Sequence, residues 1–565
     1  MNGDALIFAG PARAMDAEAA SRWFFDSFAL VEAAGRRAAE VLLAAFPSLF
    51  GASSGKPGVV ALAGSGNNAA DALVILRTLI LAERAAPEKA AVVIGKIPGP
   101  GERTPRSEAF RSLEKMGVRV FPLGADPDPA LGEILRRADL LIDGVAGTGL
   151  EGPLRGPLAD LVGQVNCLAA GADGGRRPLV VSVDLPSGNS DHRKEGEPVL
   201  SADATLAIEP MKFCLYDPAA RPRAGKILPV RGIFPRELTE KYRAAELISW
   251  DRAASLIPPV KRNAYKYSRG LLEIRAGSSG ASGAARIAAR AAQAVGTGLI
   301  RLVADPQIHQ PLAANAGGLM VVPSETGGEV LGIGAAPEGV SRFKPHAVLL
   351  GPGWGKSPAR RKILEEALAL EEAGIPLILD ADAIGLAKGR VFHGSALLTP
   401  HPGELAAYGD IPKEDLLAHP APLLLSLARE KKAVVLFKTH VMFVAAPDGR
   451  LGLVDGMAPV LGAGGSGDLL AGFCAGIAAR CLAVNRDDSG GAAASAAPSR
   501  ETPSPDLYAC ALAAAALLIR AAEDPLLAGR FTDPLELADK AADIAGRAWL
   551  PSWSGGAGFW GEPHE

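Results

Sequence analysis

The chain has 565 residues, and at about 100 to 200 residues per domain this length predicts two to four domains rather than one. Hydrophobic residues make up 48% of the chain and charged residues 21%, which is typical of a folded globular protein and excludes a disordered or fibrous one. The formal net charge of -3 gives no electrostatic reason to expect a nucleic acid or an anionic membrane as a partner.

The five cysteines are scattered without a C-x-x-C pair, so the sequence indicates neither a disulfide framework nor a thiolate zinc site. The start of the chain lacks the basic flank and continuous apolar stretch of a secretory signal, and we therefore expect a cytoplasmic protein. No apolar run reaches the roughly 20 residues that span a bilayer. The closest run, residues 507–519, is rich in Ala and predicts a buried helix.

Short apolar runs alternate with helical stretches through the first half of the chain. They are VVALAG (59–64), AAVVIGKI (90–97), RVFPL (119–123), ADLLIDGVAG (138–147) and PLVVSVDLPSG (178–188). Apolar strands separated by helices predict a parallel sheet that is covered on both faces.

The same alternation restarts in the second half of the chain. Its apolar runs are GLLEIRAG (270–277), LIRLVAD (299–305), AVLLGPG (347–353), PLILDADA (376–383), SALLTPHPGE (395–404) and AVVLFK (433–438). We interpret the polar stretch 235–266 as the connection, so two α/β domains, 1–240 and 241–550, are expected to meet near residue 245. Residues 485–505 are of low complexity and predict a mobile loop, and residues 551–565 form a tail of similar character.

The first apolar run leads into a glycine turn, Gly64-Ser65-Gly66, followed by Asn67-Asn68-Ala69-Ala70-Asp71 and an apolar helix. A glycine turn between a strand and a helix is a common nucleotide-binding pattern, but no Gly-Lys-Ser/Thr follows, so it is not a P-loop. The oxygens of the two Asn and the Asp suit a weakly held cation. Capping and Asx-turn chemistry is the alternative interpretation.

A second glycine-rich segment, GAGGSGD at residues 462–468, precedes the apolar helix LLAGFCAGIAAR. Free N–H groups at a helix start favour a phosphate, and glycine lets the backbone approach it closely. Asp468 could be a capping carboxylate. Because a carboxylate next to a phosphate is electrostatically unfavourable, we expect it instead to accept a proton from an attacking hydroxyl.

GAGGSGDLLAG resembles the anion-hole motif of ribokinase-like enzymes, in which the Asp activates a substrate hydroxyl for phosphoryl transfer. The upstream segments resemble, in order, the motif series of ADP-dependent NAD(P)H-hydrate dehydratases over about residues 255–545. These segments are GLLEIRAGSSGASGAARIAARAAQAVGTGLIRL, LLGPGWG, LILDADAIGLA, LLTPHPGEL and VVLFKTHVMFV. The resemblance implies a ribokinase-like three-layer α/β domain.

By this resemblance Asp468 is the catalytic base and Mg²⁺ shares the charge of the transferring group. The hydrated nicotinamide nucleotide would contact Gly353 and segment 401–407, which includes His401, Pro402, Gly403 and Glu404. ADP would contact segments 438–442 and 458–467, including Lys438, Thr439, His440, Val441, Met442, Gly462, Ala463, Gly464, Gly465, Ser466 and Gly467.

Three positions in these motifs have a second interpretation. Taken alone, His401 would be an ordinary polar residue at a strand end, and Asp380 and Asp382 would be turn and cap residues. However, His401 directly follows an apolar strand, and open α/β sheets bind ligands at such strand ends. The family motif DADALN is not complete here, because Gly385 stands at the position of the Asn.

DGVAGTGLEGPLRGP (143–157) and VDLPSGNSDHRKEG (183–196), together with the first glycine turn, resemble the NAD(P)H-hydrate epimerase domain over about residues 10–240. The resemblance implies a Rossmann-like three-layer domain, a potassium ion held by Asn68, Asp143 and Ser187, and Asp184 as the acid/base residue. Asp184 as a structural turn residue is the alternative. The implied substrate contacts are Asn67, Asn68, Ala69, Ala70, Asp71, Gly147, Thr148, Gly149, Leu150, Glu151, Gly152 and Pro153.

The first glycine turn departs from the family pattern, since N-N-A-A-D-A stands where the family has N-N-G-G-D-G. An added Cβ costs about 1 to 2 kcal/mol wherever the backbone must be left-handed, and elsewhere it crowds a ligand. Weakened or lost epimerase activity is therefore the alternative. The oxygen ligands are all present, so we expect a working site.

Both halves together resemble the bifunctional NAD(P)H-hydrate repair enzymes. The resemblance implies epimerisation of the R and S hydrates of NADH and NADPH, and ADP-dependent dehydration of the S hydrate that releases AMP and phosphate. The expected partners are these small molecules, and neither a nucleic acid nor a membrane is expected. Whether the chain forms a homo-oligomer is left open. The choices between ADP and ATP, and between the two hydrates, stay open as well. The alternative is a ribokinase-like small-alcohol kinase, for instance of a vitamin precursor, with a non-catalytic nucleotide-binding or scaffold module as its N-terminal half.

Overall fold

The computed structural model describes residues 3–51, 55–124, 129–171, 177–314, 316–324, 344–355, 357–488, 504–527 and 529–551. The chain divides into two compact units. The N-terminal unit contains Asp4–Glu246 with Leu417–Pro420, and the C-terminal unit contains Leu247–Leu416 and the chain from Ala421 onward.

The polar stretch 235–266, which we interpreted as the connection, includes the division between the two units at Glu246 and Leu247. It contains α7 (Arg236–Lys241), β10 (Ala245–Leu247) and α8 (Trp250–Ser255). Each helix buries an apolar side chain, Leu238 in α7 and Ala253 in α8, and α7 also buries Thr239. Short helices with one buried residue per turn give too weak an apolar period to be recognised in the sequence.

Seven parallel strands form the sheet of the N-terminal unit, in the order β4-β3-β2-β5-β6-β7-β9. The five predicted strands are all present, and β7 and β9 were not predicted. The strands are β2 (Val59–Ala63), β3 (Ala90–Ile94), β4 (Arg119–Pro122), β5 (Leu140–Gly144), β6 (Leu179–Val183), β7 (Ala204–Ile208) and β9 (Lys226–Val230). Two short strands, β1 (Asp4–Ile7) and β8 (Met211–Lys212), pair with each other in parallel.

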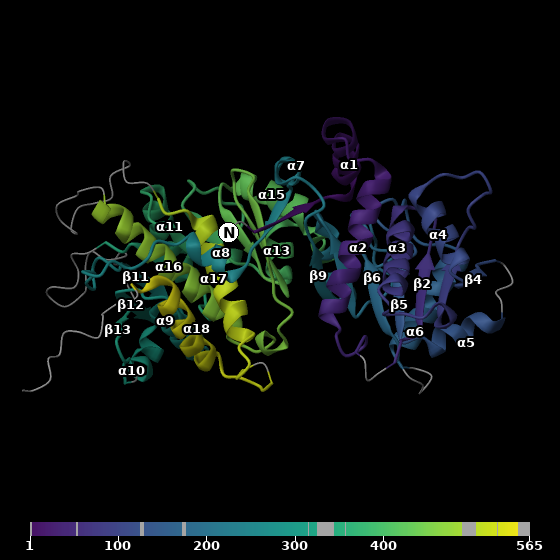
Figure 1. Ribbon diagram of the computed structural model, residues 1–565. Helices are drawn as coiled ribbons and strands as arrows, with labels where there is room; N and C mark the ends of the chain where they lie inside the picture. The colour runs from purple at the N-terminus through teal and green to yellow at the C-terminus, as the bar shows by residue number, and fades with distance from the viewer. Residues whose placement is uncertain are drawn as a thin grey trace, which may run out of the picture. The chain divides into compact units, whose positions relative to one another are not determined.

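Helices cover both faces of this sheet (Figure 1). One face buries Leu42, Leu73 and Phe110 from α2, α3 and α4, and the other buries Leu135 and Leu161 from α5 and α6. The helices are α1 (Ala9–Trp23), α2 (Ser27–Ala45), α3 (Asn67–Leu81), α4 (Pro105–Lys115), α5 (Pro129–Arg137) and α6 (Pro157–Ala169), with one-turn 3-10 helices at Pro87–Lys89, Phe213–Leu215 and Arg221–Arg223. The predicted three-layer α/β architecture is confirmed.

The C-terminal unit has strand order β13-β12-β11-β14-β15-β16-β17-β18-β19. The strands are β11 (Leu271–Arg275), β12 (Leu299–Ala304), β13 (Met320–Pro323), β14 (Ala347–Leu350), β15 (Leu377–Leu379), β16 (Ala396–Leu398), β17 (Val434–Phe437), β18 (Val441–Ala445) and β19 (Leu451–Asp455). From β13 to β17 they are parallel, as predicted, whereas β17, β18 and β19 are antiparallel. The turn between β18 and β19 contains Asp448-Gly449, and this dipeptide is a hairpin signal.

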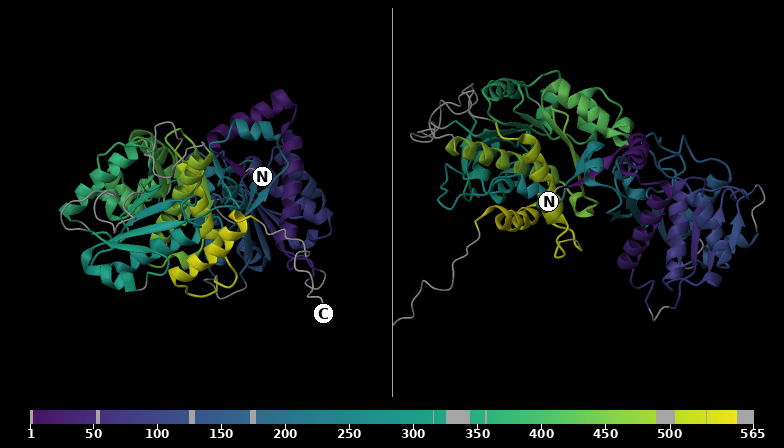
Figure 2. Two further views of the ribbon diagram at one scale, coloured as in Figure 1. Left: turned by 90° about the vertical axis from the view of Figure 1, so that its left-hand side faces the viewer. Right: turned by 45° about the horizontal axis from the view of Figure 1, so that its top comes forward.

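Figure 2 shows this sheet between two helical layers. One face packs against α9, α16, α17 and α18, whose buried residues form a continuous core with the strands, and α11 packs on β15. The helices are α9 (Ser282–Ala294), α10 (Pro306–Ala314), α11 (Pro358–Glu372), α12 (Asp382–Leu386), α13 (Pro402–Gly409), α14 (Lys413–Ala418), α15 (Pro420–Lys431), α16 (Ser466–Asp488), α17 (Leu507–Ala522) and α18 (Pro534–Trp549), with a 3-10 turn at Pro459–Leu461.

One helix of the described residues is long and apolar enough, by length and composition, to cross a membrane, contrary to our expectation from the sequence. It is Ser466–Asn485 of α16, with a mean hydropathy of 1.5. Its glycines and Asp468 interrupt the apolar run and hid it in the sequence. Because 83% of the apolar window is buried, mainly against α9 and α17, this helix has the surroundings of a core helix, and its composition is weak evidence for a membrane span.

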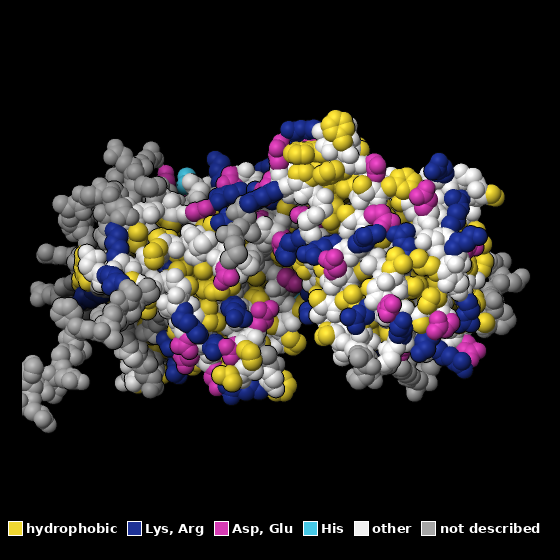
Figure 3. All heavy atoms as spheres, in the orientation of Figure 1, with side chains coloured by type: hydrophobic (Ala, Val, Ile, Leu, Met, Phe, Trp, Pro, Cys, Tyr) yellow, Lys and Arg dark blue, Asp and Glu magenta, His cyan; other side chains and the backbone are white. Residues whose placement is uncertain are grey.

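The two low-complexity segments are only partly described. Residues 489–503 of the predicted loop and residues 552–565 of the tail lie outside the described residues. The first residues of the predicted loop are helical, since α16 continues to Asp488. On the face drawn in Figure 3, basic and acidic side chains of both units are interspersed.

The packing of α3 on β5 depends on Gly144, and this yields a prediction. A Cβ on Gly144 would lie 2.6 Å from Cβ of Ala72 and 2.7 Å from the Asn68 carbonyl oxygen. Gly144→Ala should therefore lower the free energy of unfolding of the N-terminal unit by about 1 to 3 kcal/mol, measured by urea denaturation. Gly163→Ala in α6 is the control, because its Cβ would meet nothing within 4 Å. A destabilisation no larger than the control's would contradict this packing argument.

Candidate active sites

A cavity of about 570 Å³ lies in the N-terminal unit, beside the carboxyl ends of β2, β5 and β6. Ligands of open α/β sheets bind at this edge. The predicted substrate residues that line it are Asn67, Asn68, Asp71, Gly147, Thr148, Gly149, Leu150 and Asp184. The other predicted contacts, Ala69, Ala70, Glu151, Gly152 and Pro153, do not line it: the two alanines are buried in α3, and the Glu151 side chain is 86% exposed.

Residues Asn67–Asp71 are the first turns of α3, not a loop as we had expected. Gly66 is the N-cap, with an extended backbone, and neither Ala69 nor Ala70 has a positive φ. The energetic cost of a Cβ in a left-handed backbone therefore does not arise at either alanine. In a helix, alanine is more favourable than glycine by up to about 1 kcal/mol. The position where a side chain would collide with a neighbouring backbone is instead Gly64, where a Cβ would lie 1.9 Å from the Val145 carbonyl oxygen.

The three predicted potassium ligands lie around the backbone of Ala146. Asn68 Nδ2 donates to the Ala146 carbonyl (3.0 Å), and Ala146 N–H donates to Ser187 Oγ (2.8 Å). Ser187 in turn donates to Asp143 through its hydroxyl and through its N–H. Asn68 Oδ1 is buried and accepts no hydrogen bond from the described residues. An unpartnered amide oxygen beside a carboxylate and a hydroxyl is a donor set that suits a hard monovalent cation.

Asp184 lies at the end of β6 in a strained turn. Its φ is +61°, and Leu185 N–H donates to the Val183 carbonyl across it at 2.7 Å. A three-residue turn with a positive φ is rare, and such strain is concentrated at functional sites. The carboxylate accepts from Lys212 Nζ at 2.7 Å, and the same ammonium donates to the Ile208 carbonyl at 3.1 Å.

Sequence reasoning missed Lys212 and Asp16, which both line the cavity. Lys212 belongs to no motif, but it is a single lysine within the apolar run MKFCL, and a charge in such a run requires a buried partner. Asp16 is on α1, ahead of the motifs, and no pattern of residues marked it. Burial raises the pKa of Asp16, and the charge of Lys212 opposes this.

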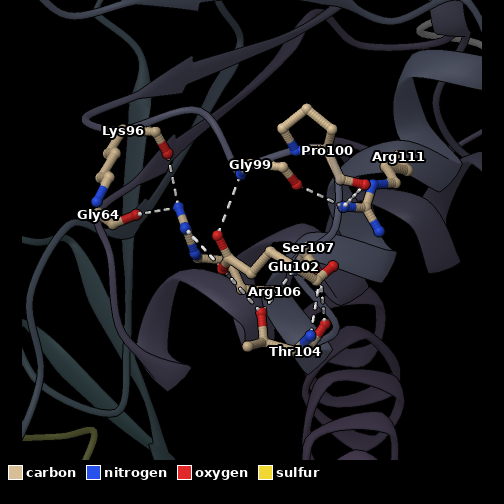
Figure 4. Close-up of polar contacts among 9 residues, drawn as sticks. All are labelled: Gly64, Lys96, Gly99, Pro100, Glu102, Thr104, Arg106, Ser107 and Arg111. Carbon is tan, nitrogen blue, oxygen red and sulfur yellow. Dashed lines mark hydrogen bonds and ion pairs between the residues drawn. The ribbon is translucent and has the colours of Figure 1, made fainter.

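A third missed residue, Arg106 of α4, holds the glycine turn in place (Figure 4). Its buried guanidinium donates to the Gly64 carbonyl (3.3 Å), the Lys96 carbonyl (2.7 Å) and Glu102 Oε1 (3.3 Å). Thr104 caps α4 in a reciprocal capping box with Ser107. The turn that leads into α3 is therefore anchored by a charge-assisted hydrogen-bond network, not by the glycines alone.

The second site lies in the C-terminal unit, where β15, β16 and β17 end. Asp380 is almost fully buried and accepts from Thr399 Oγ1 at 2.7 Å and from Lys438 Nζ at 2.5 Å. It is thus an ion-pair partner rather than a simple turn residue. Burial lowers the pKa of Lys438, but the charges of Asp380, Glu404 and Asp468 outweigh burial and leave that pKa above its ordinary value.

Asp468 is in the first turn of α16, next to the ammonium of Lys438. A Cβ on Gly467 would be 3.5 Å from Lys438 Nζ. Burial and the negative charge of Asp380 raise the pKa of Asp468 to about 6, while Lys438 opposes them. Gly465 has φ +98°, and a Cβ there would be 2.7 Å from Ile287, so only glycine fits. Gly462, Ala463 and Gly464 are exposed in the same segment.

The remaining predicted contacts of this site are held by local hydrogen bonds. His401 is the N-cap of α13, where Nδ1 accepts from Gly403 N–H and Glu404 N–H and the Glu404 side chain completes a capping box. Gly353 has φ +56° and packs closely on Ala281. Asp382 accepts from Gly355 N–H at 2.8 Å and so ties the GPGWG segment to α12. Thr439 bonds within its own turn to Val441, which like Met442 is buried in β18.

Both units match known families. Residues 27–214 match the YjeF-related protein N-terminus, and residues 272–519 match the NAD(P)H-hydrate dehydratase. The chain is 33% identical over 469 residues to the bifunctional NAD(P)H-hydrate repair enzyme of Gloeobacter violaceus, covering 80% of this chain and 85% of that protein. It is 29% identical over 513 residues to the enzyme of the same name from Salinibacter ruber, covering 84% and 88%.

Among solved structures, the ADP/ATP-dependent NAD(P)H-hydrate dehydratase from Bacillus subtilis, co-crystallised with ATP and Mg²⁺, is 20% identical. It covers 54% of this chain and 98% of its own, with a TM-score of 0.42. The match to the Gloeobacter violaceus enzyme, at 33% identity over most of both chains, shows the family. The chain belongs to the bifunctional NAD(P)H-hydrate repair enzymes.

Proposed function

We propose that this enzyme repairs hydrated NADH and NADPH. The N-terminal unit interconverts the R and S hydrates, and the C-terminal unit dehydrates the S hydrate with ADP as phosphoryl donor, releasing AMP and phosphate. The observation that carries the proposal is Asp468, a half-buried carboxyl in the first turn of α16 beside the ammonium of Lys438. This supports the proposal, because a helix start favours a phosphate and a carboxyl there could accept the proton of an attacking hydroxyl.

The dehydration proceeds through a phosphorylated intermediate, because hydroxide is a poor leaving group. Asp468 takes the proton of the substrate hydroxyl while the hydroxyl oxygen attacks the terminal phosphorus of the nucleotide. The ring nitrogen then donates its lone pair, the carbon–oxygen bond breaks, phosphate leaves, and loss of a neighbouring proton restores the double bond. Backbone N–H groups of 463–465 and 467 would stabilise the transferring group, since those of Gly462 and Ser466 donate to the Pro459 and Ala463 carbonyls. Such donors are typically worth about 3 to 4 kcal/mol each.

Two cations complete the proposal. Among the described residues no three His, Cys, Asp or Glu side chains lie close enough to hold a metal ion. Mg²⁺ would therefore be bound mainly by the nucleotide phosphates, as is common for this ion, and would neutralise their charge. K⁺ would be held in the N-terminal unit by Asn68, Asp143 and Ser187, where Asn68 Oδ1 is the unpartnered oxygen, and would orient the substrate.

The rival function, a small-alcohol kinase with a silent N-terminal half, is not favoured. The relatives match over both units, and the N-terminal unit has a cavity lined by charged side chains. We propose a cytoplasmic location, as for a metabolic enzyme acting on small molecules. The most direct test is incubation with the mixed hydrate epimers and ADP. Recovery of the absorbance of the reduced nicotinamide supports the proposal, whereas a stable phosphorylated product would support the kinase.

Removal of the base gives a sharp prediction. Asp468→Asn keeps the shape of the side chain but cannot accept the proton, so the kcat of dehydration should fall by about 10²- to 10⁴-fold. The assay uses the S hydrate with ADP, and thermal unfolding checks that the variant is folded. Asp539→Asn, an exposed position on α18, is the matched control. Turnover near wild type in Asp468→Asn would refute its role as base.

The raised pKa of Asp468 predicts the pH dependence of the same reaction. Its value of about 6 lies above the ordinary 3.8, and a base must be ionised to act. Activity should therefore be full above about pH 7 and fall about tenfold per pH unit once the pH drops below about 6. The measurement is kcat for the S hydrate across this range at constant ionic strength. An acidic limb near pH 4 would contradict the raised pKa of Asp468, because that is the ordinary range of an aspartate.

The alanines of α3 allow a test of the epimerase half. Ala69→Gly with Ala70→Gly restores two of the three glycines of the family pattern, yet both positions are helical and buried. We expect epimerisation to stay at or below the wild-type rate and stability to fall by about 1 kcal/mol per substitution. Epimerisation is followed by the proportion of R and S hydrates on a chiral separation, and stability by urea denaturation. A large gain in epimerisation would mean that the methyl groups obstruct the substrate.

A further inference from the structure

The cavity of the N-terminal unit contains more carboxyl groups than the assigned chemistry uses. Asp71 and Asp184 are each 8% exposed and Lys212 is 6% exposed. They come from three elements: α3, the turn after β6, and β8. The ammonium of Lys212 is committed to Asp184 (2.7 Å), whereas Asp71 Oδ1 is buried and has no hydrogen-bond partner among the described residues.

The other charged side chains near Asp71, Asp184 and Lys212 do not provide a second cation for Asp71. Arg13 is at the rim, with a side chain 58% exposed and 3.7 Å from Glu151. Asp16 on α1 adds a further carboxyl, and the thiol of Cys214 lies close enough for the charge of Asp184 to raise its pKa, after burial has done so. The titratable or charged groups that line the cavity with the two aspartates are Arg13, Asp16, Glu209 and Lys212, and the Glu209 carboxylate accepts from Gly232 N–H and Ile233 N–H. Cys214 is near Asp184 but does not line the cavity.

The surroundings of the two aspartates therefore separate their protonation. Burial, and then the charge of Asp184, raise the pKa of Asp71 well above its ordinary value. Burial also raises the pKa of Asp184, but the charge and the hydrogen bond of Lys212 oppose it. Asp71, which has no cation of its own, therefore holds a proton more tightly than Asp184, which is paired with Lys212. Pairs of carboxyl groups whose pKa values are pushed apart in this way act as acid and base.

We propose that Asp71 and Asp184 are an acid–base pair on the two faces of the substrate's hydroxylated carbon, and that Lys212 is a positioning residue that holds the charge on Asp184. This assignment rests on the proposed epimerase function and names the groups that perform it. It adds a catalytic role for Asp71 and a function for Lys212.

In the reaction, Asp71 gives its proton to the hydroxyl and the carbon–oxygen bond breaks, with its electron pair leaving on oxygen as water. The lone pair of the ring nitrogen forms a carbon–nitrogen double bond. A water molecule then attacks the opposite face, the π pair returns to nitrogen, and Asp184 takes the proton of that water. Transfer of the proton from Asp184 back to Asp71 resets the site. One water leaves and one enters, so no oxidant or other reactant is needed.

The first experiment is Asp71→Asn in the full chain. The amide keeps the volume and can donate a hydrogen bond but cannot give up a proton, so kcat of epimerisation should fall by about 10²- to 10⁴-fold with little change in KM. Dehydration of the S hydrate by the same protein is the internal check on folding and should be unchanged. Asp160→Asn, exposed in the first turn of α6, is the matched control. Unchanged kcat in Asp71→Asn would overturn the assignment.

The second experiment addresses Lys212. Lys212→Met removes the cation, so the pKa of Asp184 should rise and the acidic limb of kcat for epimerisation should move to higher pH, whereas Lys212→Arg should restore the wild-type profile. Lys241→Met removes an exposed lysine paired with Glu18 and serves as control. A purely structural lysine would lower activity without moving the limb, and that result would overturn its positioning role.

A measurement on the wild-type enzyme tests the bond that breaks. In oxygen-18 water, each inversion should bring one solvent oxygen into the hydrate, after correction for uncatalysed exchange. Retention of the original oxygen would overturn the carbon–oxygen cleavage. The outcomes also separate the two levels of the argument. A wild-type chain without epimerisation refutes the proposed function, whereas a wild-type chain that epimerises together with an equally active Asp71→Asn refutes the acid–base pair alone.

Discussion

In each unit, a largely enclosed lysine is paired with a buried aspartate at the carboxyl ends of parallel strands. The two ion pairs are Lys212 with Asp184 at 2.7 Å and Lys438 with Asp380 at 2.5 Å. Charges withdrawn from water are costly unless they are paired, so each lysine fixes where one negative charge can reside. A further carboxyl in each site, Asp71 or Asp468, lacks a cation of its own and has a raised pKa. The shortage of cations thus produces a proton-binding group in both sites.

Backbone packing brings these groups together. A Cβ on Gly351 would lie 1.8 Å from the Asp380 carbonyl oxygen, and a Cβ on Gly64 would lie 1.9 Å from that of Val145. Both glycines directly follow a strand, at the point where the chain crosses a neighbouring strand end. The close approach at Gly351 sets the position of Asp380, whose carbonyl it meets, and the close approach at Gly64 sets the start of α3. Sheet-edge geometry, rather than flexible loops, therefore places the candidate catalytic groups.

The sequence predicted the features that are governed by local patterns. Every apolar run that we expected to be a strand contains one, because a buried parallel strand requires a continuous apolar segment. The glycine segment before Asp468 does open a helix, as the N-terminal phosphate argument requires. The antiparallel hairpin β18–β19 was missed although Asp448-Gly449 signals it, since the apolar runs on either side resemble those of parallel strands.

The residues that the sequence did not reveal act through contacts between distant segments. Lys212 reaches Asp184, 28 positions earlier in the chain, and Arg106 reaches the Gly64 carbonyl, 42 positions earlier. No periodicity records such a pair. Asn67–Asp71 was expected to be a loop because Asn and Asp favour turns. Tertiary packing of Ala69, Ala70 and Ala72 decides otherwise and extends the helix to the edge of the cavity.

The hydrogen bond of Lys438 to Asp380, rather than to Asp468, affects the basicity of Asp468. A direct ion pair between them would lower the pKa of Asp468 and make it a weak base, whereas no lysine nearby would leave the carboxyl protonated near neutral pH. Lys438 is instead bonded to Asp380, and its charge reaches Asp468 only through space. The result is a pKa of about 6, at which the carboxyl is ionised at neutral pH yet still has appreciable affinity for a proton. A general base is most effective when its pKa lies near the pH at which it works.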